Sequence, residues 1–190
     1  REEVMNILIT GAAGFVGKNL CAALKNINIP DGVTEIGAYT FHYCRALESI
    51  ELPDSVTVIG IHAFDSCNAL ASIKLPSGLK NIASDMLLSC WSLETVELPE
   101  GLLGLGANAF RDCRSLKTIT IPGSLNQFDA TVFGDCPALE SVTIEEGVTR
   151  IGNYAFQNCT ALTEVNLPDT LQIIDKSAFF GCKALTSIVI

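Results

Sequence analysis

The eight cysteines of this chain recur at a constant interval of 23 residues. They are Cys21, Cys44, Cys67, Cys90, Cys113, Cys136, Cys159 and Cys182. A fixed period of roughly 20 to 50 residues is the signature of a repeat protein, in which each unit buries its apolar face by stacking on the next. The spacing therefore predicts a solenoid with one continuous core, and it places all eight cysteines in one column of that core.

Further apolar residues recur in register with the cysteines, in the pattern Cys-x-x-Leu-x-x-Ile-x-Leu-Pro-x-x-Leu-x-x-Ile-x-x-x-Ala-Phe, as from Cys44 to Phe64. The Ile-x-Leu pair predicts a short strand that ends at the proline, because proline has no amide hydrogen to donate. A second short extended piece follows. The Ala-Phe-x-x-Cys segment is interpreted as one or two helical turns whose Phe and Cys face the core. About nine inward side chains per coil, each worth roughly 1.5 to 3 kcal/mol when buried, are enough to hold the stack.

From about Cys21 to Ile190 this pattern resembles the leucine-rich repeats of the BspA-like family of bacterial and protozoan surface proteins. The resemblance implies an α/β leucine-rich repeat solenoid of 23-residue units, built from short strands plus short helical turns. This solenoid spans residues 27–190 in about seven repeats, the last one truncated. The resemblance also implies a protein-interaction scaffold, at the cell surface or secreted, that adheres to a host or extracellular-matrix protein.

The N-terminal stretch NILITGAAGFVGKNL has a different character. An apolar run, residues 7–9, predicts a strand, and Gly11, Gly14 and Gly17 predict a tight turn into a helix over residues 15–25. Over about residues 5–25 this motif resembles the glycine-rich start of an extended short-chain dehydrogenase or NAD-dependent epimerase. We expect a Rossmann-like βα unit over residues 1–26 that caps the first coil by a right-handed crossover.

The remaining parts of a dinucleotide enzyme are missing from the sequence. The resemblance implies a Tyr-x-x-x-Lys pair, but Tyr39, Tyr43 and Tyr154 each lack a lysine four residues on. No second half of a sheet follows to form a nicotinamide crevice. The three glycines are thus the only candidates for cofactor contacts, and we expect no enzyme activity, no catalytic residue and no cofactor.

His42 and His62 lie at variable positions of their repeats, and we interpret both as solvated. The cysteines are expected to be reduced and buried, acting as small hydrophobic side chains. Neighbouring coils stack at about 4.8 Å, so parallel cysteines keep their Cβ atoms farther apart than the mean of about 3.8 Å in a disulfide, and a bridge requires distortion. Zinc requires converging ligands with short spacings that are absent here, so no metal is expected.

The chain carries a net charge of −9, with 21 acidic and 12 basic residues. Such a surface repels phosphate backbones and anionic headgroups, which excludes nucleic acid as a partner. No apolar run approaches the roughly 18 residues of a membrane-spanning helix, so no membrane insertion is expected. We also find no signal-peptide pattern in this chain.

The outward positions of the predicted strands form two polar columns. A polar ladder of this kind is the usual recognition surface of a solenoid, although serine and threonine also suit any solvated strand. The candidate interaction residues are Ser49, Glu51, Ser72, Lys74, Thr95, Glu97, Thr118, Thr120, Ser141, Thr143, Glu164 and Asn166. Neither column holds an aromatic anchor, and Trp91 is interpreted as packing at the edge.

Three functions stay open at this point. The first is the protein-interaction scaffold, and the second is an engineered or chimeric repeat array with a foreign βα cap and no activity of its own. These two are compatible and rank above the third, a dinucleotide-binding protein. The chain closes on the strand-like residues 187–190, whose open edge can pair with another chain, so a homodimer through the C-terminal coil is expected.

Overall fold

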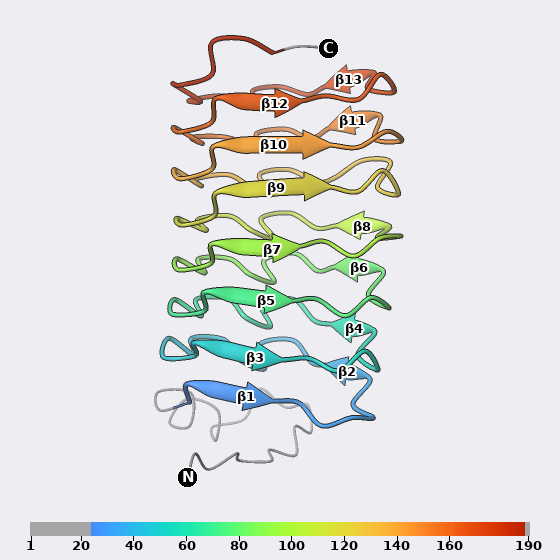
Figure 1. Ribbon diagram of the computed structural model, residues 1–190, viewed down its shortest axis with the longest axis vertical. Coiled ribbons are helices and arrows are strands. Elements are labelled where there is room, and N and C mark those ends of the chain that lie inside the picture. The colour runs from blue at the N-terminus through green and yellow to red at the C-terminus, as the bar shows by residue number, and fades with distance from the viewer. Residues whose placement is uncertain (1–23, 189–190) are drawn as a thin grey trace.

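The computed structural model describes residues 24–188, and this described part is a β-solenoid of short strands and turns without a helix (Figure 1). One face, named the ladder face, holds β1 (Asn26–Asn28), β3 (Ser49–Glu51), β5 (Ser72–Lys74), β7 (Thr95–Glu97), β9 (Thr118–Ile121), β10 (Ser141–Ile144) and β12 (Glu164–Asn166). A second face holds β2 (Glu35–Ile36), β4 (Val58–Ile59), β6 (Asn81–Ile82), β8 (Gly104–Leu105), β11 (Arg150–Ile151) and β13 (Ile173–Ile174). The predicted leucine-rich repeat solenoid is confirmed.

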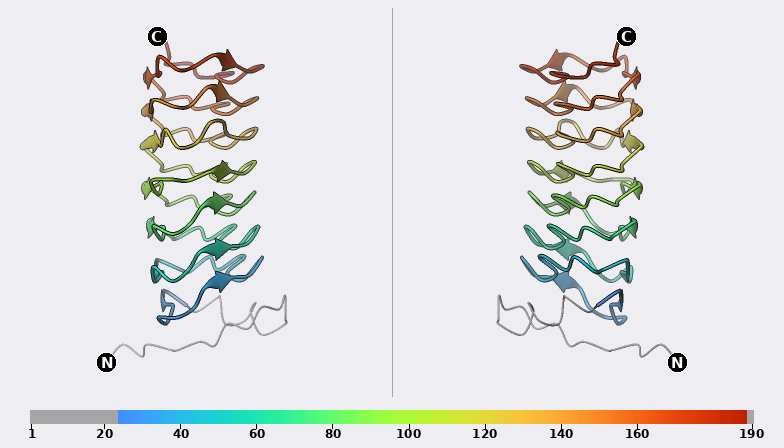
Figure 2. Two further views of the ribbon diagram at one scale, coloured as in Figure 1. Left: turned by 90° about the vertical axis from the view of Figure 1, so that its right-hand side faces the viewer. Right: turned by 90° about the vertical axis from the view of Figure 1, so that its left-hand side faces the viewer.

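Each coil lies on the next one in a parallel register of 23 residues. Asn26 pairs with Ser49 at one end of the stack, and Ser141 pairs with Glu164 near the other. Six such steps lead from β1 to β12 (164 − 26 = 6 × 23). The coils form a nearly straight column (Figure 2), so the ladder face is flat along the axis.

The turn that leads to each cysteine is not helical, and the predicted helical turns are wrong. Tyr39 and Tyr43 have left-handed backbone, with φ of 59° and 62°, whereas every residue of an α-helix has negative φ. The amide of Phe41 donates to the carbonyl of Ala63 at 2.8 Å, and that of Tyr43 donates to Asp65 at 2.9 Å. Alternate amides of this segment therefore bond to the next coil, and the others, such as that of Cys44 to Phe41 at 3.0 Å, form tight turns within the coil instead of a helix.

The same two left-handed positions recur in every described coil. Their non-glycine members are Tyr39, Tyr43, His62, Ser66, Asp85, Ser89, Asn108, Asp112, Thr131, Asp135, Tyr154, Asn158 and Ser177. Asn and Asp tolerate this conformation best, and a β-branched residue tolerates it worst. Thr131 is thus the most strained member of the set.

We expect Thr131→Asn to raise the free energy of unfolding by about 1 kcal/mol, because left-handed backbone costs a non-glycine residue roughly 1 to 3 kcal/mol. The equivalent position one coil earlier is already Asn108, at φ 55°. Urea denaturation measures the change. Thr143→Asn, on an exposed strand position with ordinary backbone, is the control and is expected to give no gain. An equal gain in both variants would contradict this explanation.

The predicted βα cap over residues 1–26 lies outside the described residues, except for its last three. Of the predicted helix over residues 15–25, the structure describes Leu24 and Lys25, and neither is helical. Asn26 already belongs to β1, so the solenoid begins at the end of the predicted cap. Gly11, Gly14 and Gly17 also lie outside the described residues.

The core is built from columns of identical side chains. The rings of Phe110, Phe133 and Phe156 stack almost in parallel, with centroids 5.4 and 5.5 Å apart, and all three are fully buried. Phe41 and Phe64 continue the column at 5.3 Å, while Leu87 takes the place between the two groups. Apart from this replacement, the described coils present the same ring to their neighbours in this column.

The prediction of buried free thiols is confirmed for Cys67, Cys90, Cys113, Cys136 and Cys159. Cys182 is also free but only partly buried. The prediction is wrong at Cys44, which is disulfide-bonded. The coil spacing of about 4.8 Å lies within the Cα range of disulfides, so stacking does not exclude a bridge. Cys21 lies outside the described residues.

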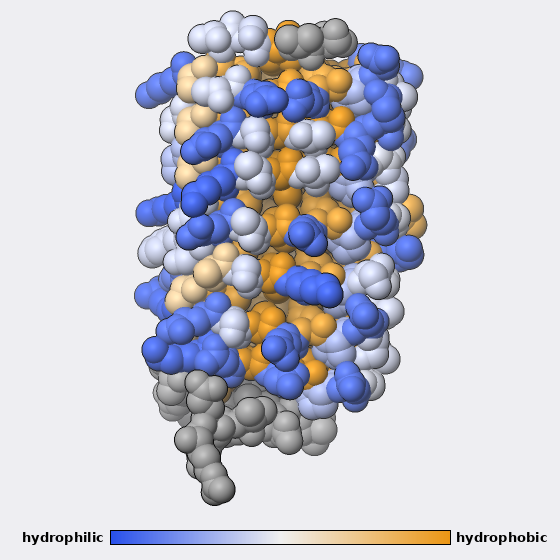
Figure 3. Space-filling model, viewed as in Figure 1, coloured by the Kyte–Doolittle hydropathy of each residue, from blue (hydrophilic) through white to orange (hydrophobic). Residues whose placement is uncertain are grey.

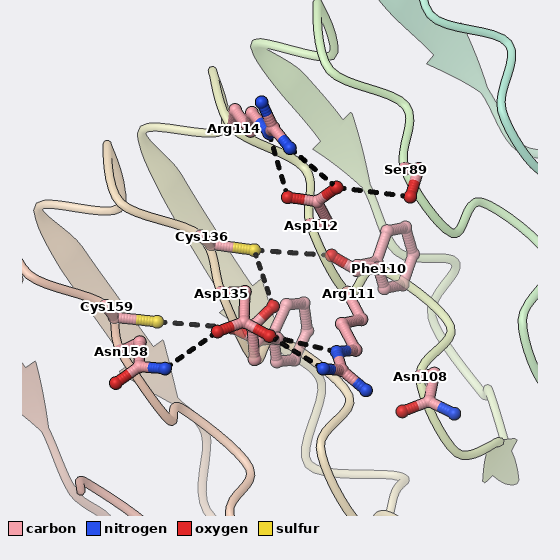
Figure 4. Close-up of polar contacts among 12 residues, drawn as sticks. Ser89, Asn108, Phe110, Arg111, Asp112, Arg114, Asp135, Cys136, Asn158 and Cys159 are labelled. Carbon is pink, nitrogen blue, oxygen red and sulfur yellow. Dashed lines mark hydrogen bonds and ion pairs between the residues drawn. The ribbon is translucent and has the colours of Figure 1, made fainter. Parts of the chain in front are cut away.

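The free thiols also donate hydrogen bonds, which the sequence interpretation missed. Cys136 Sγ donates to the backbone carbonyl of Phe110 at 3.3 Å (Figure 4), and Cys159 Sγ donates to that of Phe133 at 3.1 Å. The equivalent bonds, each 26 residues back, join Cys67 to Phe41, Cys90 to Phe64, Cys113 to Leu87 and Cys182 to Phe156. Each thiol therefore satisfies a carbonyl of the preceding coil besides filling space.

Candidate functional site

All twelve residues proposed from the sequence lie on the ladder face. They are Ser49 and Glu51 on β3, Ser72 and Lys74 on β5, Thr95 and Glu97 on β7, Thr118 and Thr120 on β9, Ser141 and Thr143 on β10, and Glu164 and Asn166 on β12. On each strand the two flank one buried apolar residue, and all are exposed except Ser141, which is partly buried. Figure 3 shows the two polar rows with an apolar stripe between them. Their role in binding stays a prediction.

Polar pairs along the ladder face connect neighbouring coils. Ser49 Oγ donates to Asn26 Oδ1 at 2.7 Å, and Lys117 Nζ lies 3.0 Å from Glu94 Oε2. Lys25 and Glu48 form the same kind of ion pair at 2.9 Å. These ion pairs are more than half exposed, so each stabilises the stack only weakly.

A hollow of about 580 Å³ opens on this face over β5, β7 and β9. Its apolar lining consists of Leu75, Val96, Leu98, Pro99, Ile119 and Pro122. Its polar lining consists of Lys74, Ser77, Thr95, Glu97, Glu100, Thr118, Thr120 and Glu145. The structure thus brings five of the twelve proposed residues into one concavity and leaves the other seven outside it. We name this feature the ladder hollow.

The prediction that His42 and His62 are solvated is wrong. His42 Nε2 and His62 Nδ1 lie 3.1 and 3.0 Å from Asp65 Oδ2, and the two imidazoles are only 28% and 25% exposed. Asp65 is itself buried, at 7% exposure, and accepts a further bond from Ser66. The four residues form a polar cluster on the turns. Residues 24–188 contain no group of three or more His, Cys, Asp or Glu side chains arranged to hold a metal ion.

A second cluster surrounds Trp91, which does more than pack at an edge. Its indole Nε1 donates to Asp112 Oδ2 at 2.9 Å, and the Arg114 guanidinium lies 4.5 Å from the centre of its ring. Arg114 and Ser89 also bond to the Asp112 carboxylate (Figure 4). Burial acts to raise the pKa of Asp112, but the bonds from Arg114, Trp91 and Ser89 together outweigh it and hold that pKa below its ordinary value.

The register of the repeat carried a signal for both clusters. His42 and Asp65 occupy the same position before their cysteines, one repeat apart, and so do Ser89 and Asp112. Trp91 and Arg114 each follow a cysteine directly. Because residues at equivalent positions stack on one another, an alignment of neighbouring repeats could have predicted these polar contacts on the turns.

The stacked coils, with one outward strand per 23 residues and columns of Leu, Ile, Phe and Cys inside, define a leucine-rich repeat solenoid. The chain belongs to the family of the BspA type leucine-rich repeat region. The family model matches residues 18–140 and 129–190, in 6 copies.

Solved structures of leucine-rich repeat proteins resemble the chain over most of its length. A leucine-rich repeat protein of T. pallidum is 34% identical with a TM-score of 0.81, covering 85% of this chain and 78% of its own. A leucine-rich cell surface protein of Faecalibacterium prausnitzii is 27% identical with a TM-score of 0.62, covering 88% and 60%. A leucine-rich repeat protein of Bacteroides ovatus is 27% identical with a TM-score of 0.56, covering 87% and 60%. No curated protein sequence is significantly similar to the chain.

These comparisons give no support to the dehydrogenase-like interpretation of residues 5–25. The match to the repeat family already begins at residue 18, within the helix predicted over residues 15–25. The three solved structures are described as leucine-rich repeat or leucine-rich proteins, and none as a dehydrogenase. The part of the chain from residue 24 to 188 also contains no helix that could cross a membrane.

Proposed function

We propose that this chain is a non-catalytic protein-interaction scaffold whose ladder face binds a protein partner. The observation that carries the proposal is the ladder face itself, on which seven strands hold paired outward side chains around a buried apolar stripe. The 23-residue register has no inserted loop, so the face presents a regular surface. Repeat solenoids commonly use such extended surfaces for recognition.

A location at the cell surface or outside the cell, and a host or extracellular-matrix protein as partner, form the finer part of the proposal. It is supported by membership in the BspA type family and by the relative from Faecalibacterium prausnitzii, which is described as a cell surface protein. The net charge of −9 argues for a protein partner over nucleic acid.

A homodimer through the C-terminal coil is part of the same proposal. Ile173, Ile174 and Phe180 are 45%, 43% and 62% exposed there. Exposed apolar side chains favour contact between protein surfaces. Light scattering over a range of protein concentrations tests for the dimer, and a strict monomer at high concentration contradicts it.

Binding to a panel of purified extracellular-matrix proteins tests the proposed function. Thr95→Trp places a large side chain on the ladder face, and Asn81→Trp places the same side chain on β6 of the second face. We expect Thr95→Trp to weaken binding at least about tenfold and Asn81→Trp to leave it unchanged. Loss of binding in the Asn81 variant alone would place the interaction on the other face.

A further inference from the structure

We propose that the ladder hollow receives a lysine or arginine side chain of the protein partner. The aliphatic part of that side chain lies on the apolar floor, and its cationic group meets Glu97 and Glu100. This inference rests on the proposed function and specifies the chemistry of the partner at one place on the ladder face.

The floor of the hollow suits an aliphatic chain. Val96 and Ile119 are 8% and 3% exposed at its base, and Leu75, Pro99 and Pro122 line it as buried residues. Long basic side chains cover apolar surface with their methylene groups while the charged group stays at the edge. A short acidic side chain has no such stem and leaves this floor uncovered.

The charge at the rim favours a cation. Three carboxylates, Glu97, Glu100 and Glu145, line the hollow against one ammonium group, Lys74. Glu145 Oε2 accepts a hydrogen bond from the amide of Gly123 at 3.1 Å, whereas Glu97 and Glu100 are exposed and make no hydrogen bond or ion pair with described side chains. Lys74 and Glu97 are cross-strand neighbours on β5 and β7. A cation is therefore attracted toward the Glu97 and Glu100 side and repelled from the Lys74 side.

The sheet is interrupted beneath the hollow. β5 pairs with β7, β9 pairs with β10, and β10 pairs with β12, but no strand ladder joins β7 to β9, as none joins β3 to β5. Thr95, Thr118 and Thr120 stand on either side of this interruption, and their hydroxyls bond to no described residue. They offer donors and acceptors to the main chain of a bound segment, which favours a polypeptide partner over a lone cation.

Selection of random peptides on the immobilised protein supplies the probe. We expect the selected peptides to contain Lys or Arg next to apolar residues and to bind more weakly at high salt. Glu97→Gln with Glu100→Gln is expected to weaken them about tenfold, since two exposed charge pairs are lost. Glu140→Gln removes an exposed carboxylate outside the hollow and is the control, with no change expected beyond about twofold.

A steric pair of variants locates the site. Thr120→Trp fills the hollow and is expected to abolish peptide binding, while Thr143→Trp, at the paired position on β10 of the ladder face but outside the hollow, is expected to weaken binding far less. If only Thr143→Trp prevented peptide binding, this inference would be overturned, while the ladder face would remain the binding surface. If neither variant changed peptide binding, both this inference and the proposed role of the ladder face would be overturned. Failure to select peptides, or binding to a glycan array with the same Thr120→Trp sensitivity, would overturn the inference as well.

Discussion

Phe133→Ala is expected to lower the free energy of unfolding by about 4 kcal/mol. Phe133 is fully buried between the rings of Phe110 and Phe156, at centroid distances of 5.4 and 5.5 Å. Removing the ring deletes its buried apolar surface and leaves a cavity against both neighbouring coils, which cannot close without moving the stack. Urea denaturation followed by circular dichroism measures the loss.

Leu103→Ala is the control for this prediction. Leu103 is 66% exposed and lies away from the proposed dimer contact, so its truncation is expected to change the free energy of unfolding by less than about 0.5 kcal/mol. Similar losses in the two variants would show that the Phe column does not form the core.

Cys182 is expected to react with iodoacetamide at least about a hundredfold faster than Cys113 in the native protein. The thiolate is the reactive form, and interaction with the neighbouring Cys159 thiol lowers the pKa of Cys182, which is also partly exposed. Cys113 is fully buried, and this burial raises its pKa well above the ordinary value. Burial likewise raises the pKa of Cys67 and Cys136 to about 12.

Mass spectrometry of peptides after a short labelling pulse at neutral pH measures these rates. In denaturant the free cysteines should react alike, which is the control for reagent access. Fast native labelling of Cys67, Cys113 or Cys136 would contradict the buried thiol column.

The columns of the solenoid could be predicted from the sequence because the repeat has no insertion. Once Cys44 and Cys67 are taken as equivalent, every other position is fixed, including the buried Ile50 and its exposed neighbours Ser49 and Glu51. The alternation of apolar and polar residues then assigns the two sides of each strand. The ladder face follows from spacing alone.

The turns could not be predicted in the same way. Ala63, Phe64 and Cys67 have the spacing of one helix face, which led to the helical interpretation. The amide of Phe64 has its partner in the next coil, the carbonyl of Met86 at 2.9 Å, whereas those of Ala63 and Cys67 form turn bonds to Gly60 and Phe64. A single repeat does not reveal such bonds, and Tyr and Thr at several left-handed positions conceal the preference for Asn, Asp and Gly.

The ladder hollow could not be predicted from the sequence either. Its shape depends on the sizes of side chains from four coils, which the repeat pattern does not encode. The contact between Trp91 and Arg114 is different, because both residues directly follow a cysteine and could have been paired by register.

The core, the ladder face and the hollow all depend on the 23-residue register, which zero-length carbodiimide cross-linking tests most directly. Lys25 Nζ lies 2.9 Å from Glu48 Oε1, and Lys117 Nζ lies 3.0 Å from Glu94 Oε2. Mass spectrometry is expected to find links between lysine and carboxylate residues of adjacent coils, with these two pairs, each 23 residues apart, among the strongest. Dominant intramolecular links between residues two or more coils apart, with neither of these pairs detected, would contradict the register.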